Sequence, residues 1–169
     1  TGIDFSDRSI DYAKEVAASE KLRINYVKQN YLEFETHDRF DIILMIMCDF
    51  CALSPAQRKM VLKKFHRILK PGGSVLLDVY SLSAFEQREE VATYEINQLN
   101  GFWSTNKYYG FLNTFKYDEE KVVLDKYTII ELNRTRSVYN WLQYFTLKKL
   151  DTEFKENGFH VEEFYSDVA

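Results

Sequence analysis

The feature that most constrains the fold is a nearly unbroken apolar run of strand length, from Phe40 to Met47. A strand with apolar side chains on both faces is typical of a parallel sheet that helices cover on each side. Ser54-Pro55-Ala56-Gln57 follows, and its capping serine, early proline and glutamine predict the start of a helix. Lys70-Pro71-Gly72-Gly73 is expected to end that helix before a second apolar strand, Ser74 to Tyr80.

The beginning of the chain shows the same alternation of strand and helix. Thr1 to Asp4 is predicted to be the end of a strand, and Ser6 to cap a helix over residues 7–18. A second short strand is expected from Ile24 to Lys28. Apolar strands that alternate with amphipathic helices favour an α/β fold, in which a parallel sheet lies between two helical layers.

Beyond this part the pattern changes, because aromatic residues concentrate between Thr93 and Leu147. Three long antiparallel strands joined by polar connectors are predicted there, over residues 107–117, 122–133 and 137–146. A helix over residues 147–157, closed by Gly158, and a last strand over residues 160–165 are expected to return to the main sheet.

These patterns divide the chain into two regions. Residues 1–92 and 147–169 are predicted to form an α/β core, and residues 93–146 an antiparallel β insertion. The net charge of −4 argues against a nucleic-acid partner, since phosphate binding requires a basic face. No apolar run reaches the length of a membrane span, so no membrane partner is expected. Two cysteines do not make a disulfide scaffold, and they indicate a reducing cytoplasm.

Asp4 ends the first strand just before a helix, where Rossmann-like folds place a carboxylate that accepts both ribose hydroxyls. Taken alone, a helix-capping aspartate explains Asp4 equally well. Together with the strand Phe40-Asp41-Ile42-Ile43-Leu44 and the turn Leu69-Lys70-Pro71-Gly72-Gly73, however, the ordered set resembles class I S-adenosylmethionine-dependent methyltransferases. The resemblance implies a Rossmann-like three-layer methyltransferase sheet with an antiparallel β lid insertion, and S-adenosylmethionine as the cofactor.

The resemblance also implies roles for residues at the ends of the first two strands. Asp4 would bind the ribose of the cofactor, and Phe5 would lie near its adenine. Asn30 stands where many members carry an aspartate, and its side-chain carbonyl would accept a hydrogen bond from the adenine amino group. Tyr31 would offer its backbone N–H to the same ring.

The residues that leave the long apolar strand are the next candidates. Ile46 and Met47 would lie near the methionine end of the cofactor, although core packing would also suit them. Asp49 follows the strand end, where open α/β sheets bind ligands, and could orient an acceptor amine or act as a base. A surface or helix-entry aspartate is the alternative. Cys48 and Cys51 form a Cys-x-x-Cys pattern, for which buried, inert thiols are expected rather than a zinc or redox site.

The aromatic insertion supplies candidates for the acceptor. In methyltransferases such an insertion after the fifth strand often forms a lid over the substrate. Trp103, Tyr109 and Trp141 are predicted to line an apolar pocket or a cage for a cationic acceptor. Most of the other rings are expected to form the core of the sheet or a dimer face. The predicted partner is therefore a small-molecule methyl acceptor, and a homodimer is also considered.

The family's glycine-rich loop precedes the acidic position by about 20 residues. We therefore expect this chain to lack that loop and the first strand, and to be the C-terminal part of the enzyme. The predicted function is S-adenosylmethionine-dependent methyl transfer to a small molecule. One alternative is a non-catalytic methyltransferase-like module whose aromatic sheet mediates assembly. Another nucleotide-binding Rossmann enzyme is a weaker alternative.

Overall fold

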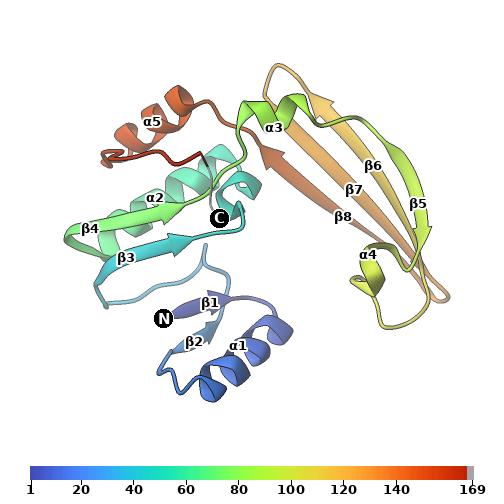
Figure 1. Cartoon of the computed structure of the whole chain (residues 1–169), viewed down its shortest axis with the longest axis horizontal. Coiled ribbons are helices and arrows are strands. Elements are labelled where there is room, and N and C mark those ends of the chain that lie inside the picture. The colour runs from blue at the N-terminus through green and yellow to red at the C-terminus, as the bar shows by residue number, and fades with distance from the viewer. Residues whose placement is uncertain (167–169) are drawn as a thin grey trace. The chain divides into compact units, whose positions relative to one another are not determined.

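The computed structural model describes residues 1–166. It divides into two compact units, one formed by residues 1–40 and the other by the chain from Asp41 onward (Figure 1). Within residues 1–166, no helix combines the length and the apolar character that crossing a membrane would require.

The first unit is a small β–α–β arrangement, consisting of β1 (Gly2–Asp4), α1 (Asp7–Ser19) and β2 (Tyr26–Lys28). The two strands are parallel, with Ile3 opposite Val27. The hydroxyl of Ser6 accepts a hydrogen bond from the backbone N–H of Ser9, which confirms the predicted helix cap. α1 buries Ile10 against the strands, so the unit is built as its pattern predicted.

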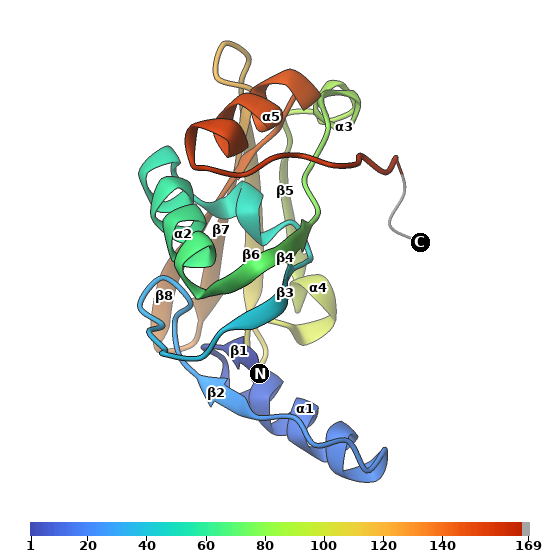
Figure 2. The same cartoon turned by 90° about the vertical axis from the view of Figure 1, so that its left-hand side faces the viewer.

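The second unit begins with an α/β layer, consisting of β3 (Phe40–Met45), η1 (Asp49–Ala52), α2 (Pro55–Ile68), β4 (Leu69–Leu77), α3 (Leu82–Glu86) and α5 (Leu147–Glu156). Strands β3 and β4 are hydrogen-bonded neighbours that run in the same direction, and Figure 2 shows α2 alongside β4. The predicted capping box at Ser54 and Gln57 is confirmed in both directions. Gly158, at φ +85°, closes α5 as expected.

Three expectations about this layer are wrong in detail. β3 is not buried on both faces: Ile43 and Met45 share the covered face, whereas Ile42 and Leu44, on the other face, are exposed. β4 begins at Leu69 and includes the predicted turn residues. Residues 160–165 form no strand, because a strand needs a hydrogen-bonded neighbour and this segment pairs with none of the described strands.

The rest of the second unit is a four-stranded antiparallel sheet with a short helical turn, consisting of β5 (Ala92–Ile96), α4 (Gln98–Gly101), β6 (Tyr109–Tyr117), β7 (Val122–Glu131) and β8 (Arg134–Gln143). The strands follow one another in the order β5-β6-β7-β8. The three long predicted strands are present, and β5 is an additional edge strand. The hairpin after β7 is tighter than expected, since Arg134 already pairs with Glu131.

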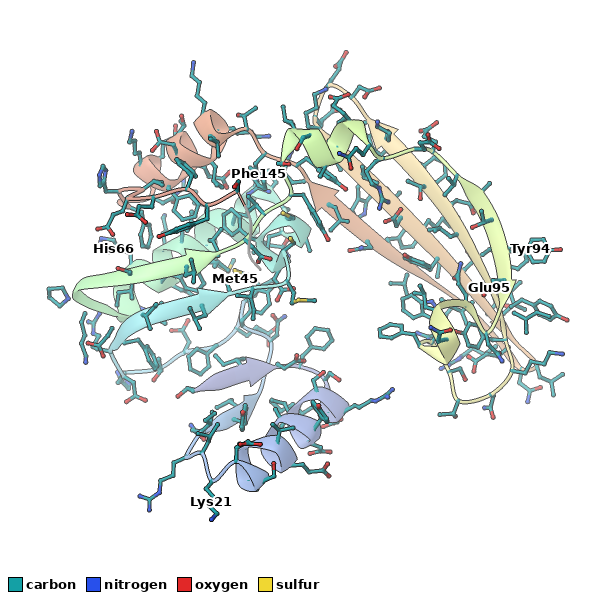
Figure 3. All side chains as sticks on the ribbon, viewed as in Figure 1. Lys21, Met45, His66, Tyr94, Glu95 and Phe145 are labelled. Carbon is teal, nitrogen blue, oxygen red and sulfur yellow. The ribbon has the colours of Figure 1, made fainter. Side chains whose placement is uncertain are left out.

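Alternation along the strands gives this sheet two different faces. Tyr94 and Glu95 are neighbours in β5 that point to opposite sides (Figure 3). The packed face carries Val123, Asp125 and Ile129, all buried. The opposite face, called the aromatic face here, carries seven rings: Tyr94, Tyr109, Phe111, Phe115, Tyr117, Tyr139 and Trp141. Most of these rings are exposed.

One end of the packed face meets the α/β layer. Phe85 of α3, Val123 and Tyr144 form a buried cluster there. Beside it the carboxylate of Asp125 accepts hydrogen bonds from the Arg88 guanidinium at 2.6 and 2.7 Å. This buried ion pair and the ring cluster attach the segment after α3 to the sheet.

Candidate functional site

In the first unit, the four predicted cofactor residues lie at one edge of the β1–β2 sheet: Asp4 and Phe5 after β1, Asn30 and Tyr31 after β2. The two strand ends are tied together, because the N–H of Gln29 donates to the backbone carbonyl of Asp4 at 3.0 Å. Carboxyl ends of neighbouring parallel strands meet at a common edge, and this is the edge at which α/β sheets bind ligands.

Asp4 is partly buried, and its Oδ1 accepts the backbone N–H of Ser6 at 2.7 Å. This bond fixes the carboxylate at the strand end, just before the helix that Ser6 caps. The structural and ligand-binding explanations of Asp4 are therefore compatible, since a ribose can use the second oxygen and the remaining lone pair of the first. The ring of Phe5 is exposed beside it.

Asn30 is exposed, and its Oδ1 accepts the backbone N–H of Leu32 at 3.0 Å. This local bond turns the chain directly after β2 and holds the side-chain carbonyl in place. A carbonyl oxygen has two lone pairs, so the bond leaves acceptor capacity for an amino group of a ligand.

In the second unit, β3 ends in a sharp turn with two consecutive left-handed residues. Met47 has φ +65° and Cys48 has φ +58°, and Asp49 then begins η1. Ile46 and Met47 are both exposed, and Met47 is 83% exposed. Core packing, the alternative explanation for these two side chains, is therefore wrong. Asp49 is exposed as well, at the same carboxyl end of β3.

The sequence reading missed Asp78, which follows the last residue of β4. Its Oδ1 accepts the backbone N–H of Cys48 at 2.9 Å, and its Oδ2 accepts the Cys48 thiol at 3.6 Å. The signal that marked Asp4, a carboxylate directly after an apolar strand, was also present in Val75-Leu76-Leu77-Asp78. Asp78 thus contacts the turn that carries Met47.

The two thiols lie at this turn. Burial, and then the charge of Asp78, raise the pKa of Cys48 to about 11. Burial raises the pKa of Cys51 to about 12, and its sulfur accepts the backbone N–H of Tyr80 at 3.2 Å. Both thiols are therefore neutral at physiological pH. Cys51 is buried as expected, whereas Cys48 is only partly buried. Among residues 1–166, no group of three or more His, Cys, Asp or Glu side chains is placed to hold a metal ion.

The structure does not bring the three predicted acceptor residues together. Trp103 packs on Tyr127 of the packed face, with ring centroids 5.1 Å apart. Tyr109 and Trp141 lie on the aromatic face, where Trp141 contacts Tyr117. The two faces of one sheet cannot line the same pocket, so the three residues belong to at least two different surroundings.

Trp141 borders a cavity of about 290 Å³ between the sheet and the start of α2. The lining is mostly apolar and includes residues from the segment that follows Asp49: Cys51, Ala52, Leu53, Ser54, Pro55, Gln57, Arg58, Val122, Trp141 and Gln143. Arg58 is buried at this position and donates to the carbonyl of Leu53 at 2.7 Å. Among the three predicted acceptor residues, Trp141 is therefore the one that lines this cavity, together with residues of η1 and of the start of α2.

Residues 1–73, which include the Asp4 edge, the β3 exit and the two glycines in the first half of β4, match a family model described as a methyltransferase domain. This part of the chain is therefore similar to methyltransferase domains. An S-adenosylmethionine-dependent methyltransferase from Clostridium acetobutylicum has the same fold, with a TM-score of 0.66 at 13% identity over 96% of this chain and 69% of that one. A sugar N-methyltransferase from Streptoalloteichus gives a TM-score of 0.58 at 17% identity, over 95% and 63% of the two chains.

Thiocyanate methyltransferase 1 from Brassica oleracea is 27% identical over 100 residues, which are 56% of this chain. The chain spans 44% of that relative's length. The Rossmann-like methyltransferase fold with an antiparallel insertion, expected from the sequence, is confirmed by these similarities. Asp4, Asn30 and the β3 exit all lie within the segment that the family model matches.

Proposed function

We propose that the protein transfers the methyl group of S-adenosylmethionine to a small-molecule acceptor. The observation that carries this proposal is the position of Asp4, at the carboxyl edge of β1 inside the segment that matches the methyltransferase domain. Residues 93–146 would form the lid region, and residues 1–92 with 147–169 the core. A cytoplasmic location fits the two free thiols.

The residues at the Asp4 edge fit the cofactor. A carboxylate can accept both hydroxyls of a ribose, and Ser6 holds the Asp4 carboxylate in place. The exposed ring of Phe5 offers an apolar surface for a purine, and Asn30 offers a carbonyl for its amino group. Tyr31 would add its backbone N–H. When bound, S-adenosylmethionine supplies a methyl group that its sulfonium already activates.

The protein's own part would be to position and desolvate the reactants. Ile46 and Met47 are exposed apolar side chains at the carboxyl end of β3, suited to the methionine portion of the cofactor. Asp49 would orient an acceptor amine, or remove its proton where the acceptor must lose one. Its position at the start of η1 fixes its backbone next to the β3 exit.

A small acceptor is favoured by charge and by the relatives. The net charge of −4 disfavours nucleic acid, and one similar fold belongs to a sugar N-methyltransferase. Trp141 would contact the acceptor from the cavity near α2. Trp103 and Tyr109 would serve only in other parts of the lid. Trp103 packs on the other face of the sheet, and Tyr109 pairs with Ile130, far along β7 from the Leu124 that pairs with Trp141.

Calorimetric titration with S-adenosylhomocysteine tests the proposal on the protein in its full natural length. The wild type should bind, and Asp4→Ala should weaken binding about 100-fold, since two hydrogen bonds to a charged group are lost. Asp7→Ala is the matched control, because Asp7 is an exposed acid nearby that pairs with Lys28. Equal affinities for Asp4→Ala and wild type would place the ribose elsewhere, and no binding by the wild type would refute the enzyme.

The aromatic face supports a second candidate, homodimerisation through the sheet. Fully burying an aromatic side chain covers roughly 150–250 Å². Seven half-exposed rings therefore offer roughly 500–900 Å², close to the ~800 Å² per partner of a stable interface. Lys126 is the one charged residue at the paired positions of this face, so an identical apolar face is a suitable partner.

Sedimentation velocity decides between the monomer and the dimer. The wild type is expected to sediment as a dimer, and the double variant Tyr94→Ser/Tyr139→Ser as a monomer, because these rings are 70% and 56% exposed. Binding of S-adenosylhomocysteine should survive in that variant if catalysis is the main function. A wild type that stays monomeric at high concentration would exclude this interface.

A further inference from the structure

The turn after β3 has an unfavourable backbone conformation, and the role proposed for this site does not explain it. Met47 and Cys48 both have positive φ, and neither is a glycine. For residues with a Cβ this left-handed region is uncommon and unfavourable, particularly at two successive positions. Such a conformation persists only where the surrounding structure holds it, and it occurs most often at functional sites.

The group that holds this turn is the carboxylate of Asp78, from the end of the neighbouring strand. Its two oxygens bind two different atoms of Cys48: Oδ1 accepts the backbone N–H at 2.9 Å, and Oδ2 accepts the thiol at 3.6 Å. A second bond, from the N–H of Tyr80 to the sulfur of Cys51 at 3.2 Å, attaches η1 to the segment that follows β4.

The residues on either side of Cys48 are those that the proposed methyl transfer requires. Met47 precedes it with an 83% exposed side chain, and Asp49 follows it as the first residue of η1. The φ angles of Met47 and Cys48 decide where both of these side chains point. Whatever fixes Cys48 therefore fixes the positions of Met47 and Asp49 relative to the end of β3.

We propose that Asp78 is a positioning residue for methyl transfer, which holds the Met47–Cys48 turn in its left-handed form and so presents Met47 to the cofactor and Asp49 to the acceptor. The effect on methyl transfer rests on the proposed function, whereas the contact between Asp78 and Cys48 is independent of that function. An aspartate suits this task because its two oxygens reach the backbone and the side chain of one residue.

The first test examines the contact itself and needs no cofactor. Alkylation of Cys48 by iodoacetamide is followed between pH 7 and 10 by peptide mass spectrometry. Asp78→Asn removes a negative charge that disfavours the Cys48 thiolate, so the rate at pH 9 should rise several-fold. Asp41→Asn is the matched control. The Asp41 carboxylate in β3 accepts hydrogen bonds from Lys70 in β4, at the ends of these strands that lie away from Cys48. An unchanged rate in Asp78→Asn would overturn the proposal.

The second test measures the consequence for binding, at a temperature well below the unfolding transition of every variant. Asp78→Ala should weaken S-adenosylhomocysteine binding about tenfold, the effect of one lost hydrogen bond. Asp78→Asn should stay within about threefold of the wild type, because its amide oxygen still accepts the N–H of Cys48. The positioning role would be overturned if the affinity of Asp78→Ala for S-adenosylhomocysteine equalled that of the wild type. It would also be overturned if Asp78→Asn bound as weakly as Asp78→Ala.

The two tests separate the failure of this inference from the failure of the proposed function. If Cys48 reactivity responds to Asp78→Asn while the wild type does not bind S-adenosylhomocysteine, the contact stands and the methyltransferase assignment fails, together with the positioning role. If the wild type binds S-adenosylhomocysteine and the alkylation rate of Cys48 is the same in Asp78→Asn as in the wild type, the methyltransferase assignment stands and this inference fails.

Discussion

Two carboxylates, Asp78 and Asp125, follow or occupy strands of the same unit and differ in what surrounds them. Asp78 comes directly after β4 and is only partly buried. Asp125 lies within β7, a strand of ten residues, and is 5% exposed. Arg88 and the hydroxyl of Thr114 both donate to it, the latter at 2.6 Å.

The surroundings of a carboxylate determine whether it can contact a ligand. A polar group inside a covered strand must be fully paired within the protein, so it contributes to structure and is closed to ligands. A polar group directly after a strand borders the edge where ligands bind, and it can stabilise a turn or contact a substrate. The cofactor candidates lie at such strand ends, whereas in the antiparallel sheet Tyr109 and Trp141 lie on the aromatic face and Trp103 on the packed face.

The largest expected effect tests the structural role of Asp125. Arg88→Met leaves this buried carboxylate without its cation, so the free energy of unfolding should fall by about 4 kcal/mol. Urea denaturation followed by circular dichroism measures the change. Arg134→Met is the control, because the Arg134 side chain is 61% exposed where it pairs with Glu131 at a hairpin, so this variant should unfold nearly like the wild type. If Arg88→Met lowered the free energy of unfolding by less than about 1 kcal/mol, the structural role of Asp125 that sets it apart from Asp78 would be contradicted.

A smaller effect tests the two faces of the sheet with two neighbouring isoleucines. Ile129 is 0% exposed on the packed face, and Ile130 is 38% exposed on the aromatic face. Ile129→Ala should lower the free energy of unfolding by about 3 kcal/mol through the cavity that it leaves. Ile130→Ala should lower it by less than about 1 kcal/mol in the monomer. Similar losses in both variants, measured by the same urea titration, would contradict the two-faced description.

The smallest effect concerns pH and the turn after β3. Burial raises the pKa of Cys51 from 9.0 to about 12, so the folded state keeps a proton that the unfolded state loses. The contribution of this thiol to stability is complete below pH 9 and is lost as the pH rises towards 12. The free energy of unfolding falls by about 1 kcal/mol per pH unit between pH 9 and pH 12 through this thiol.

Comparing urea titrations at pH 8.5 and 10 in the wild type and in Cys51→Ala isolates this term. The variant should show a shallower fall of the unfolding free energy with pH, because its other titrating groups are unchanged. Parallel pH dependences in the two proteins would mean that Cys51 ionises as easily in the folded state as in the unfolded one.

Local features of the fold could be predicted from the sequence. The caps at Ser6 and Ser54, the helix end at Gly158 and the strand end at Asp4 were all placed correctly. Each depends on residues within four positions along the chain, such as a hydroxyl that accepts the N–H three residues later. The assignment to the methyltransferase fold also came from such local motifs, taken in order.

Tertiary structure decided the features that join distant parts of the chain. Asp78 meets Cys48 across 30 positions, and Trp103 and Trp141 lie on opposite faces because of the register of three strands. The strand expected over residues 160–165 has a suitable composition, yet no described strand pairs with it. The sequence alone therefore determined caps, turns and strand ends through near neighbours. Pairing and burial were decided by the folded chain, since hydrogen bonding and exposure depend on what lies alongside.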